Sequence, residues 1–401
     1  MSGDLPDELQ PPALGHLALF ARFLRFGLLA FGGPVAQIAM IRRELVDEER
    51  WISSAHFNRL LAVMQALPGP EAHELCVHLG MRAKGRIGGL LAGLGFMLPG
   101  LVLMLGLAWA YTRLPIRGTA LGAVFLGVQA AVIALVVRAV HRIGEHILLD
   151  RWLWIVAGAA AAASLARASF WIVLPAAGIA YGFVSTGRYR TGAVVILLAA
   201  LAAAAASFAD GGTGSWPAGT GGDTPTAAAL FWAGLKGGLL TFGGAYTAIP
   251  FVRTDTVGRG WMTDGQFLDG LGLAGVLPAP LVIFATFVGF VSGGLGGALA
   301  ITAGMFLPAF AFSLLLYERL EALADHQRLQ RILAGTAAGV IGVIAVTLVE
   351  LARTGAARTP DPFASLLIFA VGLLILYRWR SKLAAPAVLA IGGAVGLAAL
   401  R

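Results

Sequence analysis

The strongest constraint on this chain is a series of long apolar runs. One of them, GGLLAGLGFMLPGLVLMLGLAWAY at 88–111, contains no charged side chain. A run of about 20 such residues crosses the hydrocarbon core of a bilayer as a single α-helix. Only 12% of the residues are charged, compared with about 25% in soluble domains. Because the runs are continuous and not alternating, we expect an all-α polytopic membrane protein without strands.

Other features of the composition exclude several classes of protein. The first residues, MSGDLPDELQPPALG, lack the basic start of a cleavable signal peptide, so the first apolar run is expected to direct insertion. The single cysteine, Cys76, excludes an internal disulfide and a multi-cysteine metal site. The net charge of +8 requires no nucleic-acid partner, because Lys and Arg collect in the cytoplasmic loops of membrane proteins.

The chain consists of two copies of one unit. FGG occurs at 31–33 and again at 242–244, and LPGP at 67–70 corresponds to LPAP at 277–280. A basic residue precedes each FGG, a tryptophan follows it, and all matches keep their order with an offset of 209 to 211 positions. We therefore predict a first repeat at 1–190, an extra span with a Gly/Thr/Pro-rich linker at 191–227, and a second repeat at 228–401.

The predicted membrane segments number about thirteen: 18–41, 60–80, 88–111, 119–141, 152–167, 169–185, 191–209, 228–251, 267–291, 293–317, 332–352, 363–379 and 384–400. Six spans followed by one extra span would insert the second repeat upside down, so we predict inverted repeats with the N-terminus in the cytoplasm. Most basic loops then lie inside and the linker at 210–226 lies outside, as the usual distribution of Lys and Arg requires. One loop disagrees, because 42–50 would lie outside with three arginines.

Glycine and proline interrupt the first two spans of each repeat. Pro34 follows the first FGG, and two prolines one residue apart, such as Pro68 and Pro70, cannot lie within an uninterrupted helix. We expect helices to resume at Pro70 and Pro280. A helix that starts in mid-membrane presents free N–H groups and about half a positive charge, which suit an anion. Such breaks can also be packing kinks, but breaks paired between repeats are typical of secondary transporters.

Two cations occupy matching positions before the breaks. Arg25 and Lys236 each precede an FGG by six residues. A cation at the centre of a membrane helix costs about 2.5–3.5 kcal/mol and is usually retained for function. The alternative for Arg25 is that it lies near the cytoplasmic end of its span and reaches the interface. Because we find no comparable acidic residues matched between the repeats, we predict that the two cations bind an anionic substrate.

The stretch HELCVH at 73–78 raises an intramembrane metalloenzyme as an alternative. It resembles the zinc motif HExxH, but His73 and His78 lie five residues apart and differ by about 140° around an ideal helix. They then do not face one metal, so we predict no metal, no other cofactor and no catalytic residue. Glu71 and Glu74 suit the start of a helix; alternatively, Glu71 and His73 couple transport to protons. No GxxxxGK[ST] motif occurs, so the chain is not its own ATPase.

The motifs FGGPVAQIA, LPGPEAHEL, GLLAGLGFMLPG, TFGGAYTAIPFV and GFVSGGLGG together resemble those of the chromate ion transporter family, long-chain two-domain type. The resemblance covers 20–400 and implies a bacterial inner-membrane protein that exports chromate and confers chromate resistance. Many members of that family have His at the position of Gln37 and Gly at that of Ala279. Sulfate or another oxyanion as substrate, a channel function, a homo-oligomer and a membrane scaffold without transport activity stay open as alternatives.

The predicted functional residues are the matched cations, the broken segments and the proton-coupling pair Glu71 and His73. The substrate-binding set comprises Arg25, Phe31, Gly32, Gly33, Pro34, Pro68, Gly69, Pro70, Glu71, Lys236, Phe242, Gly243, Gly244, Pro278 and Pro280. The expected partners are an oxyanion substrate and the lipid bilayer.

Overall fold

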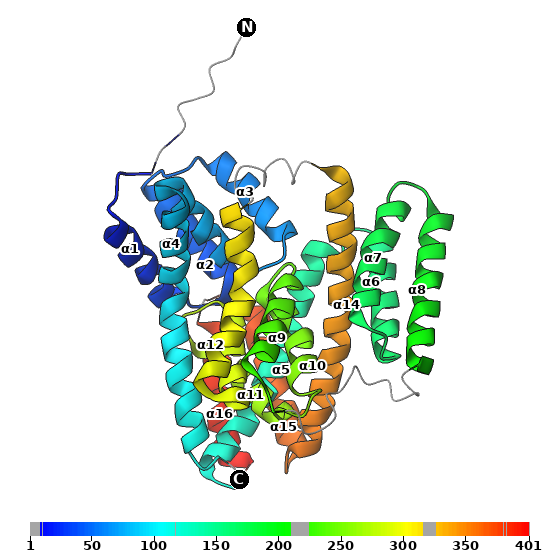
Figure 1. Ribbon diagram of the computed structural model, residues 1–401. Coiled ribbons are helices and arrows are strands. Elements are labelled where there is room, and N and C mark those ends of the chain that lie inside the picture. Colours follow the sequence, from blue (N-terminus) through cyan, green and yellow to red (C-terminus); the bar gives the residue numbers. More distant parts are fainter. Residues whose placement is uncertain are drawn as a thin grey trace.

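The computed structural model describes residues 9, 11–116, 118–209, 224–315, 326–379, 381 and 383–400. All regular elements within these residues are helices (Figure 1). Most of the predicted linker, at 210–223, lies outside the described residues, as do Arg319, Arg380 and Lys382 of the predicted cytoplasmic loops.

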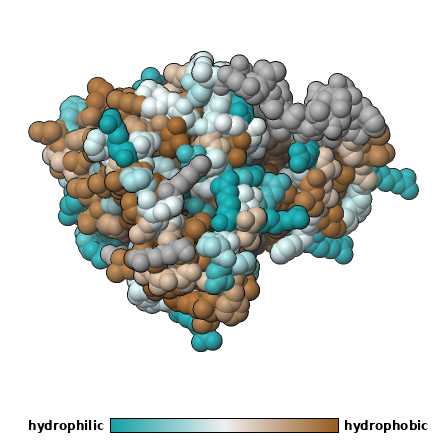
Figure 2. All heavy atoms as spheres, turned by 90° about the horizontal axis from the view of Figure 1, so that it is seen from below, coloured by the Kyte–Doolittle hydropathy of each residue, from teal (hydrophilic) through white to brown (hydrophobic). Residues whose placement is uncertain are grey.

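Among the described residues, four helical elements are long and apolar enough to cross a membrane: Glu71–Arg113, Ala120–Ile147, Leu281–Leu315 and Gln327–Arg358. Shorter apolar helices in the same residues are Arg151–Leu165, Phe170–Val184, Tyr189–Ala202, Pro362–Arg378 and Ala384–Ala399. Their apolar side chains face outward in many places; Leu366, for example, is 61% exposed. Seen from below in Figure 2, hydrophilic residues lie in the middle of the face between larger apolar areas, and further hydrophilic residues lie along its edge. These features make the chain a polytopic helical membrane protein.

The element α4 (Glu71–Arg113) consists of two helical arms that fold back on each other. Lys84 and Gly85 leave the helical conformation, with φ angles of −147° and 61°, and the positive φ suits glycine. Beyond this turn, Gly88 lies against Gly80, so closely that a Cβ atom on either residue would overlap the backbone of the other. The boundary predicted between the spans at 60–80 and 88–111 is therefore present as this turn.

The element α12 (Phe284–Leu315) repeats this turn in the second half of the chain. Gly293 and Gly294 have φ angles of −140° and 62° and lie 209 positions after the two turn residues of α4. The glycine pair Gly289 and Gly297 again brings the two arms into backbone contact. The two halves of the chain thus share a turn that lies at equivalent positions and has nearly the same φ angles.

The second arms of α4 and α12 run antiparallel to each other. Gly89 packs against Leu314, and Gly93, one turn further along α4, packs against Phe310, one turn earlier in α12. The turn of α4 therefore lies at one end of the molecule and the turn of α12 at the other, and Figure 1 shows α12 ending near the upper end where α4 turns.

The first predicted span does not run straight through. It consists of α1 (His16–Leu29) and α2 (Gly33–Arg42), followed by the π-helix η1 (Arg43–Glu48). Glu44 returns to form an ion pair with Arg25 of α1, so the chain has reversed its direction between α1 and η1. We call such a pair of half-helices a hairpin and the non-helical segment between them its tip.

Three further hairpins follow, and each takes the place of a span that the sequence predicts as an interrupted helix, for which a re-entrant course was open. They are α3 (Ser54–Ala66) with the first arm of α4, α9 (Ala227–Leu239) with η2 (Ala245–Ala248) and α10 (Ile249–Thr256), and α11 (Asp264–Val276) with η3 (Leu281–Ile283) and the first arm of α12. The four tips are 30–32, 67–70, 240–244 and 277–280.

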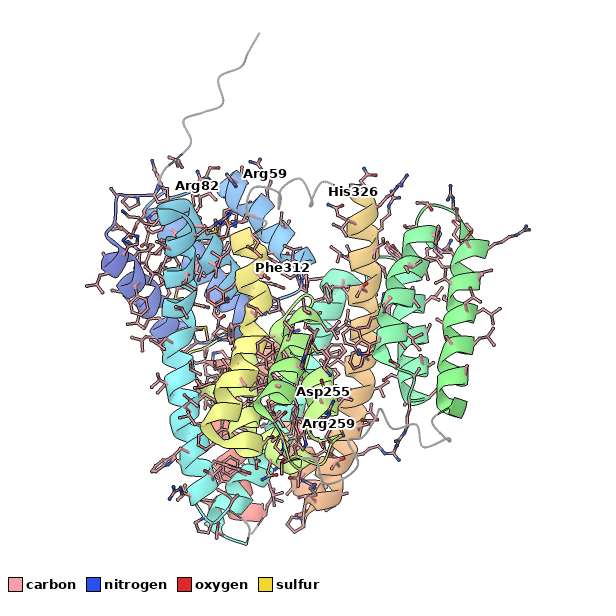
Figure 3. All side chains as sticks on the ribbon, viewed as in Figure 1. Arg59, Arg82, Asp255, Arg259, Phe312 and His326 are labelled. Carbon is pink, nitrogen blue, oxygen red and sulfur yellow. The ribbon has the colours of Figure 1, made fainter. Side chains whose placement is uncertain are left out.

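The hairpins of the two repeats occupy opposite ends of the molecule. In Figure 3, Arg59 of α3 and Arg82 of α4 are labelled at the upper end, whereas Asp255 and Arg259 lie in the lower half. At that lower end, Gly293 in the turn of α12 lies beside the start of α9. The tips of both repeats consequently point towards the middle.

The remaining helices surround the hairpins. They are α5 (Ala120–Ile147), α6 (Arg151–Leu165), α7 (Phe170–Val184), α8 (Tyr189–Ala209), α14 (Gln327–Arg358), α15 (Pro362–Arg378) and α16 (Ala384–Ala399). Helix α5 packs against α15 and α16, and α14 packs against α6 and α7. Both α5 and α14 also contact η2, so they enclose the adjacent tip at 240–244 within protein. This enclosure matters because irregular backbone is not tolerated in contact with lipid.

Candidate functional site

Hydrogen bonds join the tips of the first repeat to those of the second. The N–H of Gly69 donates to the carbonyl of Thr241, with 2.8 Å between N and O. The side-chain NH₂ of Gln37 donates to the carbonyls of Ala30 and Ala279 at 2.9 and 3.0 Å. The Gly69–Thr241 and Gln37–Ala279 contacts each link a hairpin from the upper end with one from the lower end. The segments η2 and η3, which follow the two tips of the second repeat, also contact each other, so all four tips belong to a single central site.

The sequence of each tip explains why the helix stops and resumes there. The tip glycines have positive φ angles: Gly32 90°, Gly33 76°, Gly69 146°, Gly243 67° and Gly244 140°. Other residues rarely adopt such angles. Pro34 lies in the first turn of α2, while Pro70 and Pro280 immediately precede α4 and η3. The predicted helix starts at Pro70 and Pro280 are confirmed, and Pro68 and Pro278 are buried within the same tips.

The backbone N–H groups at the tips are not all available to a ligand. Gly69 already donates its N–H across the repeats, so this group is not free for an anion. The N–H of Phe242 donates to the hydroxyl of Thr247 at 3.0 Å. By contrast, the N–H groups of Gly243 and Gly244 meet no acceptor among the described residues. The N–H groups of Gly32 and Gly33 likewise meet no acceptor among the described residues. Free donors therefore lie at both FGG tips.

The two predicted phenylalanines have different surroundings. Phe242 is 6% exposed and belongs to a hydrophobic cluster with Phe170 and Phe251. Phe31 is half-buried, like Pro34, and the neighbouring Gly32 is exposed. The tip at 30–32 is thus the more open of the two FGG tips, whereas the ring of Phe242 contributes to packing.

Each of the two predicted cations is held in an ion pair. Arg25 pairs with Glu44, and the Lys236 ammonium lies 2.5 Å from a carboxylate oxygen of Asp255. Glu44 and Asp255 are 211 positions apart, as are Arg25 and Lys236. The prediction that no acidic residues are matched between the repeats is therefore wrong. The two cations balance two matched acids, so their presence alone does not indicate an anionic substrate.

The two ion pairs differ in burial. The side chain of Arg25 is 55% exposed and lines an open charged cavity of about 500 Å³ with Arg22, Arg43 and Glu49. None of the tip residues lines this cavity. Lys236 is only 16% exposed and lies one turn before the tip at 240–244. The structure thus keeps Lys236 close to the tips and leaves Arg25 in a surface cluster.

Four titratable residues lie buried on the first arm of α4, namely Glu71, His73, Glu74 and His78. The His73 ring is enclosed by Phe306 and Phe310, with ring centroids 4.9 and 4.7 Å away. Glu74 lies against Gly69, where a Cβ atom would overlap its carboxylate. In the described residues, no three His, Cys, Asp or Glu side chains come together as a metal-binding group.

The equivalent positions of the second repeat are apolar. Leu281, Ile283, Phe284 and Val288 lie 210 positions after Glu71, His73, Glu74 and His78, and all are buried. The breaks are shared by the two repeats, whereas buried titratable groups directly after the second break occur in the first repeat alone.

Sequence reasoning missed a large cavity at the lower end. It has a volume of about 1050 Å³, and its polar lining includes Tyr111, Gln129, Asp269 and Arg358. Buried Asp269 accepts hydrogen bonds from the Tyr111 hydroxyl at 2.7 Å and from the Gln129 amide at 2.8 Å. No predicted site residue lines this cavity. A signal was present, because Gln129 and Asp269 are polar residues within apolar predicted spans.

Comparison with known proteins agrees with this architecture. The model of the chromate transporter family matches the chain twice, at 17–183 and at 228–397. The chain is 60% identical to a chromate transport protein of Pseudomonas aeruginosa, over 98% of this chain and 94% of that protein. It is 30% identical to a chromate transport protein of Cupriavidus metallidurans, over 94% and 91% of the two chains.

A more distant relative, an uncharacterized transporter of Methanocaldococcus jannaschii, is 24% identical over 90% of both chains. No solved structure matches the chain. Two full-length relatives and a family model that covers both halves carry the assignment: this chain is a transport protein and belongs to the chromate transporter family.

Proposed function

We propose that this protein moves an oxyanion, with chromate as the best candidate, across the plasma membrane and binds it at the four tips. The observation that carries the proposal is the pair of hydrogen-bonded contacts, at Gly69 and at Gln37, that joins tips from opposite ends of the molecule. A site at this position can open towards either side when one set of hairpins moves away from the other. The curated relatives named for chromate transport favour chromate over other oxyanions.

The physical basis of oxyanion binding is the set of helix starts at the tips. Free N–H groups of Gly243 and Gly244, together with the N-terminal ends of α2 and α4, offer partial positive charge. Such neutral donors can replace the hydration shell of an oxyanion without holding it in a strong salt bridge. Lys236 adds a full charge nearby, and we propose that its pairing with Asp255 loosens when the anion binds.

The hairpins lead us to propose a revised membrane topology. Half-helices that turn back in mid-membrane do not cross it, so nine crossings and four hairpins replace the thirteen predicted spans. One extra crossing, α8, still separates the repeats, which gives inverted repeats with the N-terminus in the cytoplasm. The loop at 42–50 then lies on the cytoplasmic side, and its three arginines no longer violate the charge distribution of membrane proteins.

Labelling of single cysteines tests this topology in a Cys76→Ser background. Cysteines placed in the loops at 42–50 and 186–190 are expected to react from the cytoplasmic side only, and a cysteine at Arg259 from the opposite side only. Reaction of the 42–50 loop from the outside would restore a straight first span.

We propose further that the protein is a secondary transporter that exports chromate across a bacterial inner membrane. Measurement of oxyanion flux tests this proposal. Purified protein in liposomes is expected to move radiolabelled chromate, with rates that respond to an imposed pH gradient or voltage. A flux that greatly exceeds carrier rates would indicate a channel, and sulfate flux that outcompetes chromate would indicate a sulfate permease. No flux of any oxyanion would contradict the proposed function.

A further inference from the structure

One acidic side chain at the tips has neither a hydrogen-bond partner for its carboxylate nor an ion pair among the described residues. Glu74 is fully buried, and neither of its carboxylate oxygens has a hydrogen-bond partner within the described residues. Its carboxylate lies against Gly69, in the space that a side chain would occupy there. Because Gly69 is also the residue that bonds Thr241 of the other repeat, the carboxylate lies where the two repeats join.

The titratable groups around this carboxylate are acids and histidines. Its own helix contributes Glu71, His73 and, one turn further, His78, and α3 contributes His56 near His78. The groups that other elements place nearby are uncharged: Gly69 lies directly against the carboxylate, Ala309 of α12 lies next to Gly69, Thr241 accepts from the Gly69 N–H, and Ser313 of α12 donates to the main-chain carbonyl of Glu74.

The two cations that precede the FGG tips are each paired with an acid. Lys236 of α9 pairs with Asp255, and Arg25 of α1 pairs with Glu44. An ionised carboxylate without a counter-charge costs several kcal/mol when it is buried. In this conformation, the surroundings of Glu74 therefore favour its neutral, protonated form. An ionised Glu74 would in addition repel an oxyanion that approaches the tips.

We propose that Glu74 binds a proton that travels together with the oxyanion, an inference that rests on the proposed oxyanion transport. A proton from water converts the carboxylate into a neutral carboxyl group, whose O–H then donates a hydrogen bond to the bound oxyanion. When the oxyanion leaves, the carboxyl group loses its proton to the same side of the membrane. Binding of proton and oxyanion is thereby mutually reinforcing, because each raises the affinity for the other by the same factor.

This assignment differs from the predicted proton-coupling pair. The His73 ring is enclosed by phenylalanines, whereas Glu71 belongs to the same helical turn as Glu74 but does not contact Gly69 in the same way. Asp269→Asn is the matched control: it neutralises a buried acid that lies outside the tips, where the Tyr111 hydroxyl and the Gln129 amide donate to it.

The test compares chromate binding and transport by wild type, Glu74→Gln and Asp269→Asn in the same liposomes. Chromate itself titrates near neutral pH, but this affects all three proteins equally. Relative to Glu74→Gln, wild-type affinity for chromate is expected to fall by up to about tenfold per pH unit on the alkaline side, and Asp269→Asn is expected to follow wild type. Glu74→Gln is expected to exchange chromate between the two sides yet to lose accumulation driven by a pH gradient.

Two results would overturn the inference while leaving oxyanion transport intact: wild-type affinity that changes with pH no more than that of Glu74→Gln, or full pH-driven accumulation by Glu74→Gln. Absence of chromate flux in wild type at every pH would remove the proposed function as well. A measurement on wild type alone covers the case in which Glu74→Gln does not fold. A hydrophobic carbodiimide, which modifies protonated buried carboxyl groups, is expected to label Glu74, with protection by chromate; labelling of Glu71 without Glu74 would reject the assignment.

Discussion

The tip at 67–70 and the tip at 277–280 have the same backbone plan and opposite chemistry. Both end one half-helix, place two prolines one residue apart and start the next helix after the second proline. The first is followed by Glu71, His73 and Glu74, and the second by Leu281, Ile283 and Phe284. The shared breaks belong to the architecture of the repeat, whereas the acids and the histidine of one copy give that copy a separate role, which we assign to proton binding.

The largest expected effect comes from filling the tips. Gly69→Leu and Gly244→Leu introduce a side chain at φ angles of 146° and 140°, and at Gly69 the new atoms would also overlap the Glu74 carboxylate. We expect at least a tenfold loss of chromate flux in each variant, whereas Gly→Ala is expected to be milder at both positions.

Gly106→Leu is the matched control for the tip substitutions, because nothing lies within 4 Å of the position of its Cβ atom. Flux in liposomes, normalised to inserted protein, is the measurement. Wild-type rates in both tip variants would mean that the tips are packing kinks and that the substrate passes elsewhere.

The second effect distinguishes the two ion pairs. Asp255 is only 6% exposed and, without Lys236, keeps only Arg259 at 4.0 Å. Lys236→Ala therefore leaves a buried, weakly compensated charge and is expected to cost about 3 kcal/mol of unfolding free energy. The pair of Arg25 is screened by solvent, and its loss is expected to cost less than about 1 kcal/mol. Unfolding in detergent measures both, and Lys236→Ala/Asp255→Ala is expected to recover most of the loss. Equal losses of unfolding free energy in Arg25→Ala and Lys236→Ala would show that burial does not decide how much each ion pair stabilises the protein.

A third effect concerns the residue that departs from the pattern of the first repeat. The Cβ atom of Ala279 fills the space next to Gly100, where a second Cβ atom would overlap it. Gly100→Ala is therefore expected to cost about 1–3 kcal/mol by overpacking. Adding Ala279→Gly is expected to relieve that cost, as a double-mutant cycle in thermal unfolding would measure. If the effects of the two substitutions on the unfolding free energy simply add, the cost of Gly100→Ala does not arise from contact with Ala279.

The smallest effect is expected from the proline that precedes α4. Pro70→Ala allows helix to extend into the tip and is expected to reduce flux a few-fold. Pro362, exposed in the first turn of α15, is the matched control, and its exchange for alanine is expected to leave flux unchanged. Pro115, which also lies in a loop, is not used as a control because it lines the large lower cavity. Equal flux in Pro70→Ala and wild type would argue that the tip forms without this proline.

The sequence predicted where the helices break but not that the chain turns back there. Glycine and proline report the local backbone, and the breaks at Gly33 and Pro70 follow from them directly. Hydropathy, in contrast, sums over both half-helices of a hairpin. Helices α1 and α2, with 14 and 10 residues, are each too short to cross a bilayer, which takes about 20, but together they resemble one span.

The matched acids were missed for a related reason. Between FGG and the following tryptophan, the first repeat is one residue longer than the second. The distance in sequence between equivalent residues of the two repeats therefore falls from 211 to 210 positions. The π-helix η1 takes up this residue, as single insertions into helices commonly do. Glu44 lies near the start of η1 and keeps the offset of 211. Gln37 and Glu74 could not be assigned from sequence, because their roles depend on contacts with Ala279 and Gly69 across or beside a tip.

The most direct test of the account is the position of a bound oxyanion. Tungstate, a heavy tetrahedral oxyanion, would be located by its anomalous scattering in crystals of the full-length protein. We expect one strong peak at the junction of the tips, within hydrogen-bond distance of the N–H groups of Gly243 and Gly244 and close to the Glu74 carboxyl group. A peak confined to the lower cavity, beside Arg358 and Asp269, with none at the tips, would contradict the central claim.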